Sequence, residues 1–204
     1  MKKRIMSICF LLILLLNSFT INVFAEEQKY KIESAKFYVT LNTDGSATVT
    51  ETWILNYKQG KFTRFYKNIQ TSLPMKESFD IEINEVFVDG VACTETKDKT
   101  KIVDYTYLIE ENYERIKYEI FIHSEKETRE FKITYTLKNV VKFANHSYYM
   151  FQYRFLPKGF KENISKLDIE IHVPSKFSGR TTINPTKGIP RISKLNSSST
   201  ETVS

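Results

Sequence analysis

Alternation of apolar and polar residues with a period of two runs through most of this chain, and it restricts the fold more than any other feature. Side chains of a β-strand point to opposite faces in turn, so this period indicates half-buried strands. No stretch shows sustained helical spacing with capping residues at its ends. The alternation is clearest in residues 35–41, 47–55, 79–88, 116–122, 131–137, 149–155 and 167–173.

Turn signals lie between these segments. Asp44-Gly45 predicts a tight hairpin that joins strands over 33–41 and 47–56, with a positive φ at Gly45. Asp89-Gly90 predicts a second hairpin, and a change of parity at Asn84-Glu85 predicts a β-bulge. Eight or nine short strands with such turns indicate an all-β fold, an antiparallel Ig-like β-sandwich in one domain.

Residues 1–25 have the pattern of a secretory signal peptide: a basic start, a short apolar run and a small-residue ending. We expect cleavage after Ala25, with an uncleaved anchor as the alternative; the intact mass of the exported protein distinguishes the two. The folded domain is expected over 26–175. Residues 176–204 are predicted to be a loop-rich, polar Ser/Thr tail.

Removal of the signal peptide changes the charge and the cysteine count. The formal net charge falls from +6 to +3 when Lys2, Lys3 and Arg4 leave, so a basic nucleic-acid-binding protein is not indicated. Only Cys93 remains, and one cysteine cannot form an intramolecular disulfide. An exported domain without a disulfide is typical of bacterial surface proteins, here assigned to a Gram-positive envelope.

The segment 38–52, with Asp44-Gly45-Ser46 followed by Val49-Thr50-Glu51-Thr52, resembles the opening of a bacterial family of predicted membrane proteins, domain of unknown function 2207. Residues 65–69, 131–140 and 163–174 resemble later parts of its extracytoplasmic domain, with Lys67 where the family usually has arginine. The usual tryptophan and acidic residue near 148–152 are missing. The family's transmembrane helices and Gly-rich tail are also missing, so membrane attachment is expected only through sequence not present in this chain. The resemblance implies a location and a fold but no established activity.

Glu51 is the most informative single residue. By parity it shares the face of Val49 and Trp53, and a carboxylate on a core face must be paired or neutralised. Arg64 and Lys67 are the nearest basic candidates, which predicts a structural ion pair. One alternative is a β-bulge that points Glu51 outward, and another is that Glu51 is a general acid or ligand-binding carboxylate with a shifted pKa.

The aromatic-rich segment 148–155 predicts a strand with one face toward the core. The other face would present a binding surface, since exposed tyrosine and arginine are typical of interfaces. Its residues are Tyr148, Met150, Gln152 and Arg154. A strand buried on both faces is the alternative interpretation.

No complete catalytic constellation is present in the sequence, and the three histidines have no metal-ligand spacing, so neither a metal nor a cofactor is expected. We therefore expect a non-catalytic extracytoplasmic domain that binds a protein or cell-wall polymer at the bacterial surface. The alternative is an envelope polysaccharide hydrolase that pairs Glu51 with Glu82 or Glu85.

Overall fold

The computed structural model describes residues 27–70, 80–112, 115–144, 148–157 and 159–174, and within them the chain forms twelve strands and no helix. The fold is therefore all-β, as the alternation predicts. The predicted signal peptide and the predicted tail from residue 176 onward lie outside the described residues. Cleavage after Ala25 thus stays a prediction.

The largest sheet has six strands in the order β12-β1-β2-β9-β4-β5. Four of them are long because alternating Val, Ile, Thr and aromatic residues favour a pleated, half-buried surface. Their bounds are β1 (Lys29–Leu41), β2 (Ala47–Gln59), β4 (Asp80–Val88), β5 (Val91–Ala92), β9 (Thr128–Lys138) and β12 (Leu167–His172).

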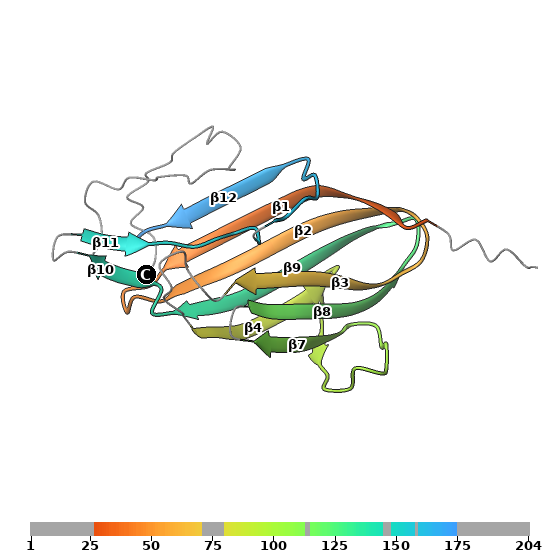
Figure 1. Ribbon diagram of the computed structural model, residues 1–204, viewed down its shortest axis with the longest axis horizontal. Coiled ribbons are helices and arrows are strands. Elements are labelled where there is room, and N and C mark those ends of the chain that lie inside the picture. The colour runs from red at the N-terminus through yellow and green to blue at the C-terminus, as the bar shows by residue number, and fades with distance from the viewer. Residues whose placement is uncertain (1–26, 71–79, 113–114, 145–147, 158, 175–204) are drawn as a thin grey trace, which may run out of the picture.

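A second sheet has four strands in the order β3-β8-β7-β6, and β10 pairs with β11 in a third. In Figure 1, β3, β8 and β7 lie across one face of the sheet that contains β1, β2, β9 and β4. The bounds are β3 (Phe62–Gln70), β6 (Thr94–Glu95), β7 (Thr106–Asn112), β8 (Arg115–Ser124), β10 (Val141–Ala144) and β11 (Tyr148–Phe151).

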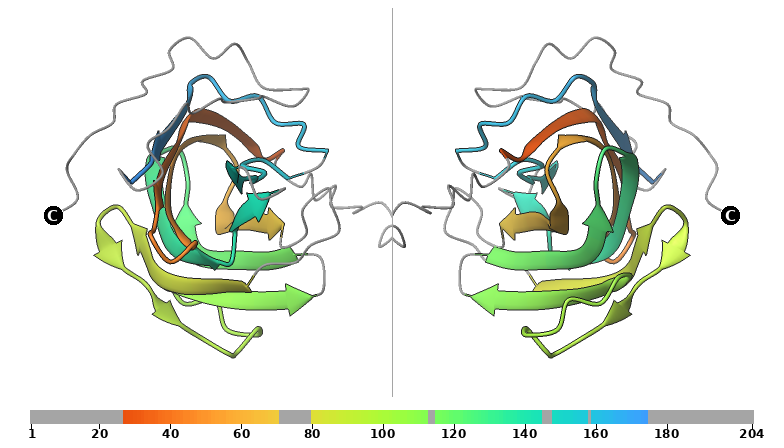
Figure 2. Two further views of the ribbon diagram at one scale, coloured as in Figure 1. Left: turned by 90° about the vertical axis from the view of Figure 1, so that its left-hand side faces the viewer. Right: turned by 90° about the vertical axis from the view of Figure 1, so that its right-hand side faces the viewer.

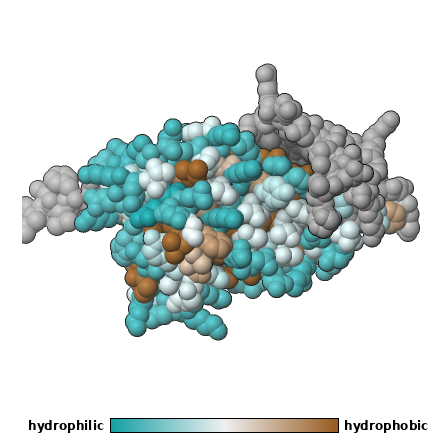
Figure 3. All heavy atoms as spheres, turned by 180° about the vertical axis from the view of Figure 1, so that it is seen from behind, coloured by the Kyte–Doolittle hydropathy of each residue, from teal (hydrophilic) through white to brown (hydrophobic). Residues whose placement is uncertain are grey.

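The two larger sheets share one hydrophobic core. Phe65 on β3 stacks on Phe131 on β9 with ring centroids 4.3 Å apart, and Trp53 on β2 lies 6.3 Å from Phe65. The end views in Figure 2 show the strands curving around this common interior. Seen from behind, in Figure 3, the described surface is mostly hydrophilic with scattered apolar side chains, whereas the residues of the core cluster are buried.

The hairpin between β1 and β2 confirms the prediction at Asp44-Gly45. Gly45 has a φ of 86°, and Asp44 Oδ1 accepts hydrogen bonds from the Ser46 amide and hydroxyl at 2.9 and 2.7 Å. These bonds hold the pKa of the exposed Asp44 carboxyl below its usual value. The predicted bulge in β4 is also present, as a register shift between Ile83 and Glu85 against β9.

Three parts of the sequence-based architecture need correction. The described residues form twelve strands rather than eight or nine, because several are only two to four residues long. The sheets are mixed rather than antiparallel, since β12 runs parallel to β1 and β6 runs parallel to β7. Parallel neighbours require a crossover connection rather than a tight turn, and residues 42–166 separate β1 from β12 while residues 96–105 separate β6 from β7. The strand expected over 149–155 ends at Phe151.

Candidate functional site

Glu51 lies in the hydrophobic core at the middle of β2, with no exposed surface. Val49 and Trp53, its neighbours on the same face, are buried as well. The residues opposite it in the sheet are Phe37 on β1 and Ile133 on β9. The strand period therefore forces a carboxylate into an apolar layer, where an unpaired charge is strongly unfavourable.

Both oxygens of the Glu51 carboxylate are occupied. Lys67 Nζ on β3 lies 3.1 Å from Oε2, and the indole N–H of Trp53 donates to the same oxygen at 2.8 Å. The Tyr135 hydroxyl on β9 donates to Oε1 at 2.5 Å. Two of these partners come from β3 and β9, so the carboxylate ties the four-stranded sheet to the six-stranded one. Charge-assisted hydrogen bonds of this kind are about twice as strong as neutral ones.

Lys67 is also buried, at 5% exposure. Its ammonium donates to the Phe155 carbonyl oxygen at 3.2 Å and lies over the rings of Trp53 at 4.5 Å and Phe37 at 5.2 Å. Burial lowers the pKa of Lys67, and the negative charge of Glu51 opposes that shift. The ammonium is thus held by one carboxylate, one carbonyl and two aromatic faces.

The charge of Glu51 acts on three tyrosines, Tyr118, Tyr135 and Tyr153. The oxygens of Tyr135 and Tyr153 lie 2.7 Å apart, and because Tyr135 gives its only proton to Glu51, Tyr153 must donate to Tyr135. The hydroxyl of Tyr118 is buried and has no hydrogen-bond partner among the described residues. Burial, followed by the charge of Glu51, raises the pKa of all three phenols.

Arg64, the other basic residue considered for Glu51, does not contact it. Its guanidinium lies 3.2 Å from Glu119 and 5.2 Å from the centroid of the Phe121 ring, both on β8. Residues three apart on a strand point to opposite faces. Because Lys67 lies on the core face, Arg64 must lie on the other face. The pair predicted from sequence is therefore made by Lys67, and Arg64 belongs to the opposite face of the sheet.

The surface predicted over 148–154 does not have the expected alternation. Tyr149, expected in the core, is 52% exposed, and its ring lies 5.0 Å from the exposed ring of Phe143. Met150, Gln152 and Arg154 are half-buried. The side chain of Tyr148 lies outside the described residues. The alternation fails because, among the described strands, β11 pairs with β10 alone in a separate hairpin, and it ends before Gln152. Binding by these four residues stays a prediction.

A cleft of about 530 Å³ opens beside the Glu51–Lys67 pair. Aromatic side chains dominate its walls, which come from β1, β2, β3 and the chain that follows β11. Sequence analysis did not identify it, although the cluster of aromatic residues at 53, 57, 62 and 65 was visible. The lining residues are Gln28, Tyr30, Ile32, Trp53, Leu55, Tyr57, Phe62, Thr63, Arg64, Phe65, Tyr66, Lys67, Asn68, Pro157, Phe160 and Glu162.

Two polar atoms of the cleft residues are buried without a hydrogen-bond partner in the described part of the chain: the hydroxyl of Tyr57 and Oδ1 of Asn68. Tyr57 is only 2% exposed. Buried polar groups are nearly always hydrogen-bonded, and leaving one unpaired costs about 1–3 kcal/mol. A cleft whose lining retains such groups is suited to a ligand that brings polar atoms of its own.

The carboxylates considered for hydrolysis do not meet. Glu82 and Glu85 lie opposite Thr136 and Thr134, on the outer face of the sheet, and both are exposed. Glu82 forms an ion pair with Lys138 at 2.6 Å. Glu51 lies on the inner face, so neither residue shares a cleft with it.

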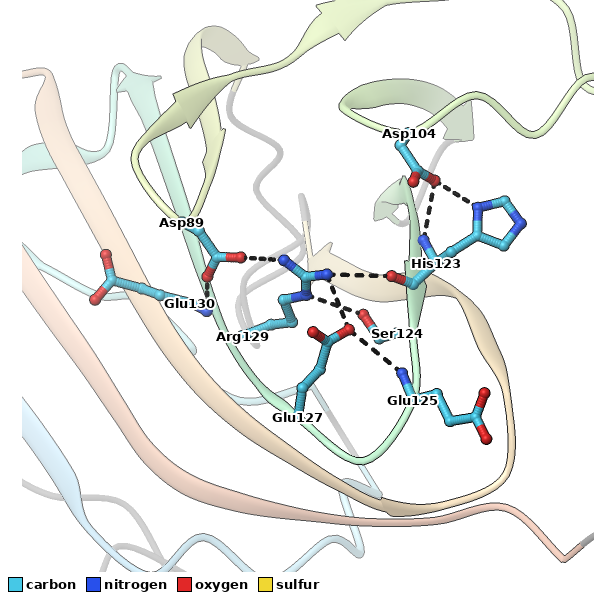
Figure 4. Close-up of polar contacts among 8 residues, drawn as sticks. All are labelled: Asp89, Asp104, His123, Ser124, Glu125, Glu127, Arg129 and Glu130. Carbon is cyan, nitrogen blue, oxygen red and sulfur yellow. Dashed lines mark hydrogen bonds and ion pairs between the residues drawn. The ribbon is translucent and has the colours of Figure 1, made fainter.

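A second polar cluster ties loops together at the turn after β8, as Figure 4 shows. Arg129 contacts Asp89 Oδ2 at 2.6 Å and Glu127 Oε1 at 2.8 Å, and it also donates to the His123 carbonyl and the Ser124 hydroxyl. Every guanidinium nitrogen of Arg129 thus has a protein partner. This occupancy fits a structural clamp rather than a binding site.

No group of three or more His, Cys, Asp or Glu side chains in the described part of the chain is placed to hold a metal ion. Within the same residues, no helix is long and apolar enough to cross a membrane.

Comparison with solved structures finds distant likenesses, two of them with the following enzymes. Leukotriene A4 hydrolase of Saccharomyces cerevisiae is 13% identical with a TM-score of 0.33, over 52% of this chain and 15% of that one. An M1 zinc metallopeptidase of Deinococcus radiodurans is 7% identical with a TM-score of 0.38, over 72% of this chain and 33% of that one. This chain thus spans only a small part of these enzymes, and TM-scores this low carry no inference about function.

A comparison with curated protein sequences finds no significant match. A family model, in contrast, matches residues 31–204, most of the chain, and its description is "Predicted membrane protein (DUF2207) N-terminal domain". The protein therefore belongs to this family of predicted membrane proteins, and the matched residues correspond to the family's N-terminal domain.

Proposed function

We propose that residues 26–175 are a non-catalytic extracytoplasmic domain that binds a partner at the surface of a bacterial envelope, and that the aromatic cleft is its binding site. The observation that carries this proposal is the cleft of about 530 Å³, in which Tyr57 and Asn68 have buried polar atoms without a hydrogen-bond partner among the described residues. Clefts of this size, mostly apolar with a few polar groups, are typical of ligand sites. Membership of a membrane-protein family supports a location at the envelope.

The Glu51–Lys67 pair has a structural role in this proposal. Its groups are almost completely buried, and both carboxylate oxygens are engaged by neighbouring donors. It holds β3 against β2, and these two strands supply most of the cleft walls. The pair therefore positions the cleft, and its Lys67 side chain is itself part of the lining.

An envelope polysaccharide hydrolase, the alternative function, requires two carboxylates on either side of a bound sugar, about 5–10 Å apart. Glu51 lies on the inner face of the six-stranded sheet, whereas Glu82 and Glu85 lie on its outer face. No observation in the described residues favours this alternative over binding.

The proposal is tested by binding of the exported protein to cell-wall sacculi and to solubilised membrane proteins of the source bacterium. Tyr30 lines the cleft and is 41% exposed, while Tyr38 lies on the same strand, is 39% exposed and does not line it. We expect Tyr30→Ala to weaken binding at least about tenfold and Tyr38→Ala to leave it unchanged. Equal effects of the two variants, or no binding to either fraction, would contradict the proposal.

A further inference from the structure

The cleft runs along the edge of a strand. Seven consecutive residues of β3, from Phe62 to Asn68, line it. Consecutive side chains of a strand point to opposite faces, so a cavity over one face would contact only every second residue. A cavity lined by all seven must follow the edge, where both faces and the backbone border it.

This edge of β3 has no partner strand among the described residues. β3 is the terminal strand of its sheet and pairs with β8 on its other side only. No backbone hydrogen bond outside that pairing is formed by residues of β3 in the described part of the chain. An edge of this kind presents a row of N–H and C=O groups that can pair with another extended chain.

Aromatic side chains form two groups along this edge. At one end the Phe62 ring lies 4.5 Å from Tyr57 and 5.9 Å from Tyr30. Farther along, the Trp53 ring lies 6.3 Å from Phe65 and 6.4 Å from Phe160. A peptide that adds to a sheet as a strand gains affinity from backbone pairing and specificity from pockets for its alternate side chains. The two aromatic groups beside the β3 edge can form such pockets.

The charge around the cleft is mainly positive. Arg64 and Lys67 in its lining are neutralised by Glu119 and Glu51, and Glu162 is the acidic side chain of the lining, so the positive charge comes from lysines beside the cleft. Lys58, near the end of β2, and Lys61, in the connection that leads into β3, are both exposed, and within the described residues no ion pair is formed by either. Complementarity therefore favours a ligand with acidic residues.

We propose that the β3 edge of the cleft binds an extended peptide segment of a partner protein, one that carries apolar side chains at alternate positions and acidic residues near them. The peptide adds as a further strand beside Phe62–Asn68, which at about 3.3 Å per residue accommodates six or seven residues. This inference rests on the proposed function, since it names the ligand class of the same cleft.

A peptide fits the observations better than a saccharide does. Sugars stack on open faces of aromatic rings, and in the cleft Tyr30 and Tyr66 are open in this way, whereas Trp53, Tyr57 and Phe65 are each less than 10% exposed. A row of alternating backbone donors and acceptors is matched in spacing by another backbone. Binding of a cell-wall saccharide in place of a peptide is therefore one of the results that the experiment distinguishes.

The test uses the exported full chain and the hexapeptide acetyl-Glu-Phe-Thr-Phe-Thr-Glu-amide, titrated by calorimetry at low salt. Two isomers of the peptide carry N-methyl groups either on both Phe residues or on both Thr residues, which removes donors from one edge or from the other. We expect one isomer to lose at least about tenfold in affinity while the other binds like the parent, because only one edge of a strand pairs with β3. A peptide with Lys in place of Glu should bind at least about fivefold more weakly.

Matched variants of the protein locate the site. We expect Tyr30→Ala and Lys61→Glu to weaken peptide binding. Tyr38→Ala and Lys97→Glu, which change exposed residues that do not line the cleft, should leave it unchanged. Circular dichroism and thermal unfolding of each variant show that the fold is retained.

The results separate the two proposals. Binding to envelope fractions that depends on Tyr30, together with no peptide binding or equal effects of the two N-methyl isomers, would overturn strand addition and leave the proposed function standing. Competition by wall saccharide but not by peptide would do the same. Loss of envelope binding altogether would remove the proposed function itself.

Discussion

Lys67 on β3 and Glu51 on β2 form an ion pair of 3.1 Å in the core, although the two strands belong to different sheets. Both side chains are almost completely buried. An ion pair in such a place stabilises the fold only weakly compared with well-packed apolar residues, but removal of one partner leaves an uncompensated charge. Removal of one charge should therefore destabilise the fold more than removal of both, and this difference can be measured.

Replacement of one partner should be strongly destabilising. Glu51→Gln keeps the shape of the side chain but leaves the Lys67 ammonium without a counter-ion, and the new amide group faces N–H or O–H donors. We expect the free energy of unfolding in urea to fall by about 3–5 kcal/mol. Glu82→Gln, which breaks the exposed ion pair with Lys138, is the control and should have little effect. If ligand binding per folded molecule fell while stability stayed unchanged, Glu51 would have a functional rather than a structural role.

Replacement of both partners should be tolerated better than replacement of one. The double variant Glu51→Leu, Lys67→Met removes both charges and keeps most of the volume. We expect it to be more stable than either single variant, since a well-packed apolar substitute for a buried pair is often neutral or stabilising. A double-mutant cycle in urea measures the coupling. Additive effects of the two single changes would show that the pair is not coupled.

Two buried tyrosines of equal size allow a matched test of the hydrogen-bond network. Tyr135→Phe removes the donor to Glu51 Oε1 and the acceptor of Tyr153, and should cost about 1–3 kcal/mol. Tyr118→Phe removes a buried hydroxyl that has no partner among the described residues, and should be neutral or stabilising. Thermal unfolding of both variants makes the comparison. The reverse order of effects would mean that the network around Glu51 is not as described.

The reactivity of Cys93 should depend on pH in a defined way. Burial raises the pKa of its thiol to about 11 from an ordinary value of 9.0. The thiolate is the reactive form, so at pH 7–8 its fraction should be about a hundredfold below that of an exposed thiol. We expect alkylation of the native exported protein by iodoacetamide to speed up about tenfold per pH unit up to about pH 10, and the urea-unfolded protein to react far faster. A plateau of the native rate below pH 9 would contradict the raised pKa.

The sequence by itself determined the local features. Alternation at 35–41 and 47–55 defined the strands of the first hairpin. Successive side chains of a strand point to opposite faces, so this pattern can be recognised from the order of adjacent residues alone. Asp44-Gly45 located its turn, because few residues other than glycine adopt a φ of 86° without strain. The same parity placed Glu51 on the core face and so required a partner for it.

Only the tertiary structure decided which residues meet. The partner of Glu51 is Lys67 rather than Arg64, and its other donors are Trp53 and Tyr135. The parallel pairing of β12 with β1 and the cleft along β3 likewise join segments far apart in the sequence. Contacts of this kind depend on how sheets pack and on which edges remain open, and the alternation within one strand contains no information about either.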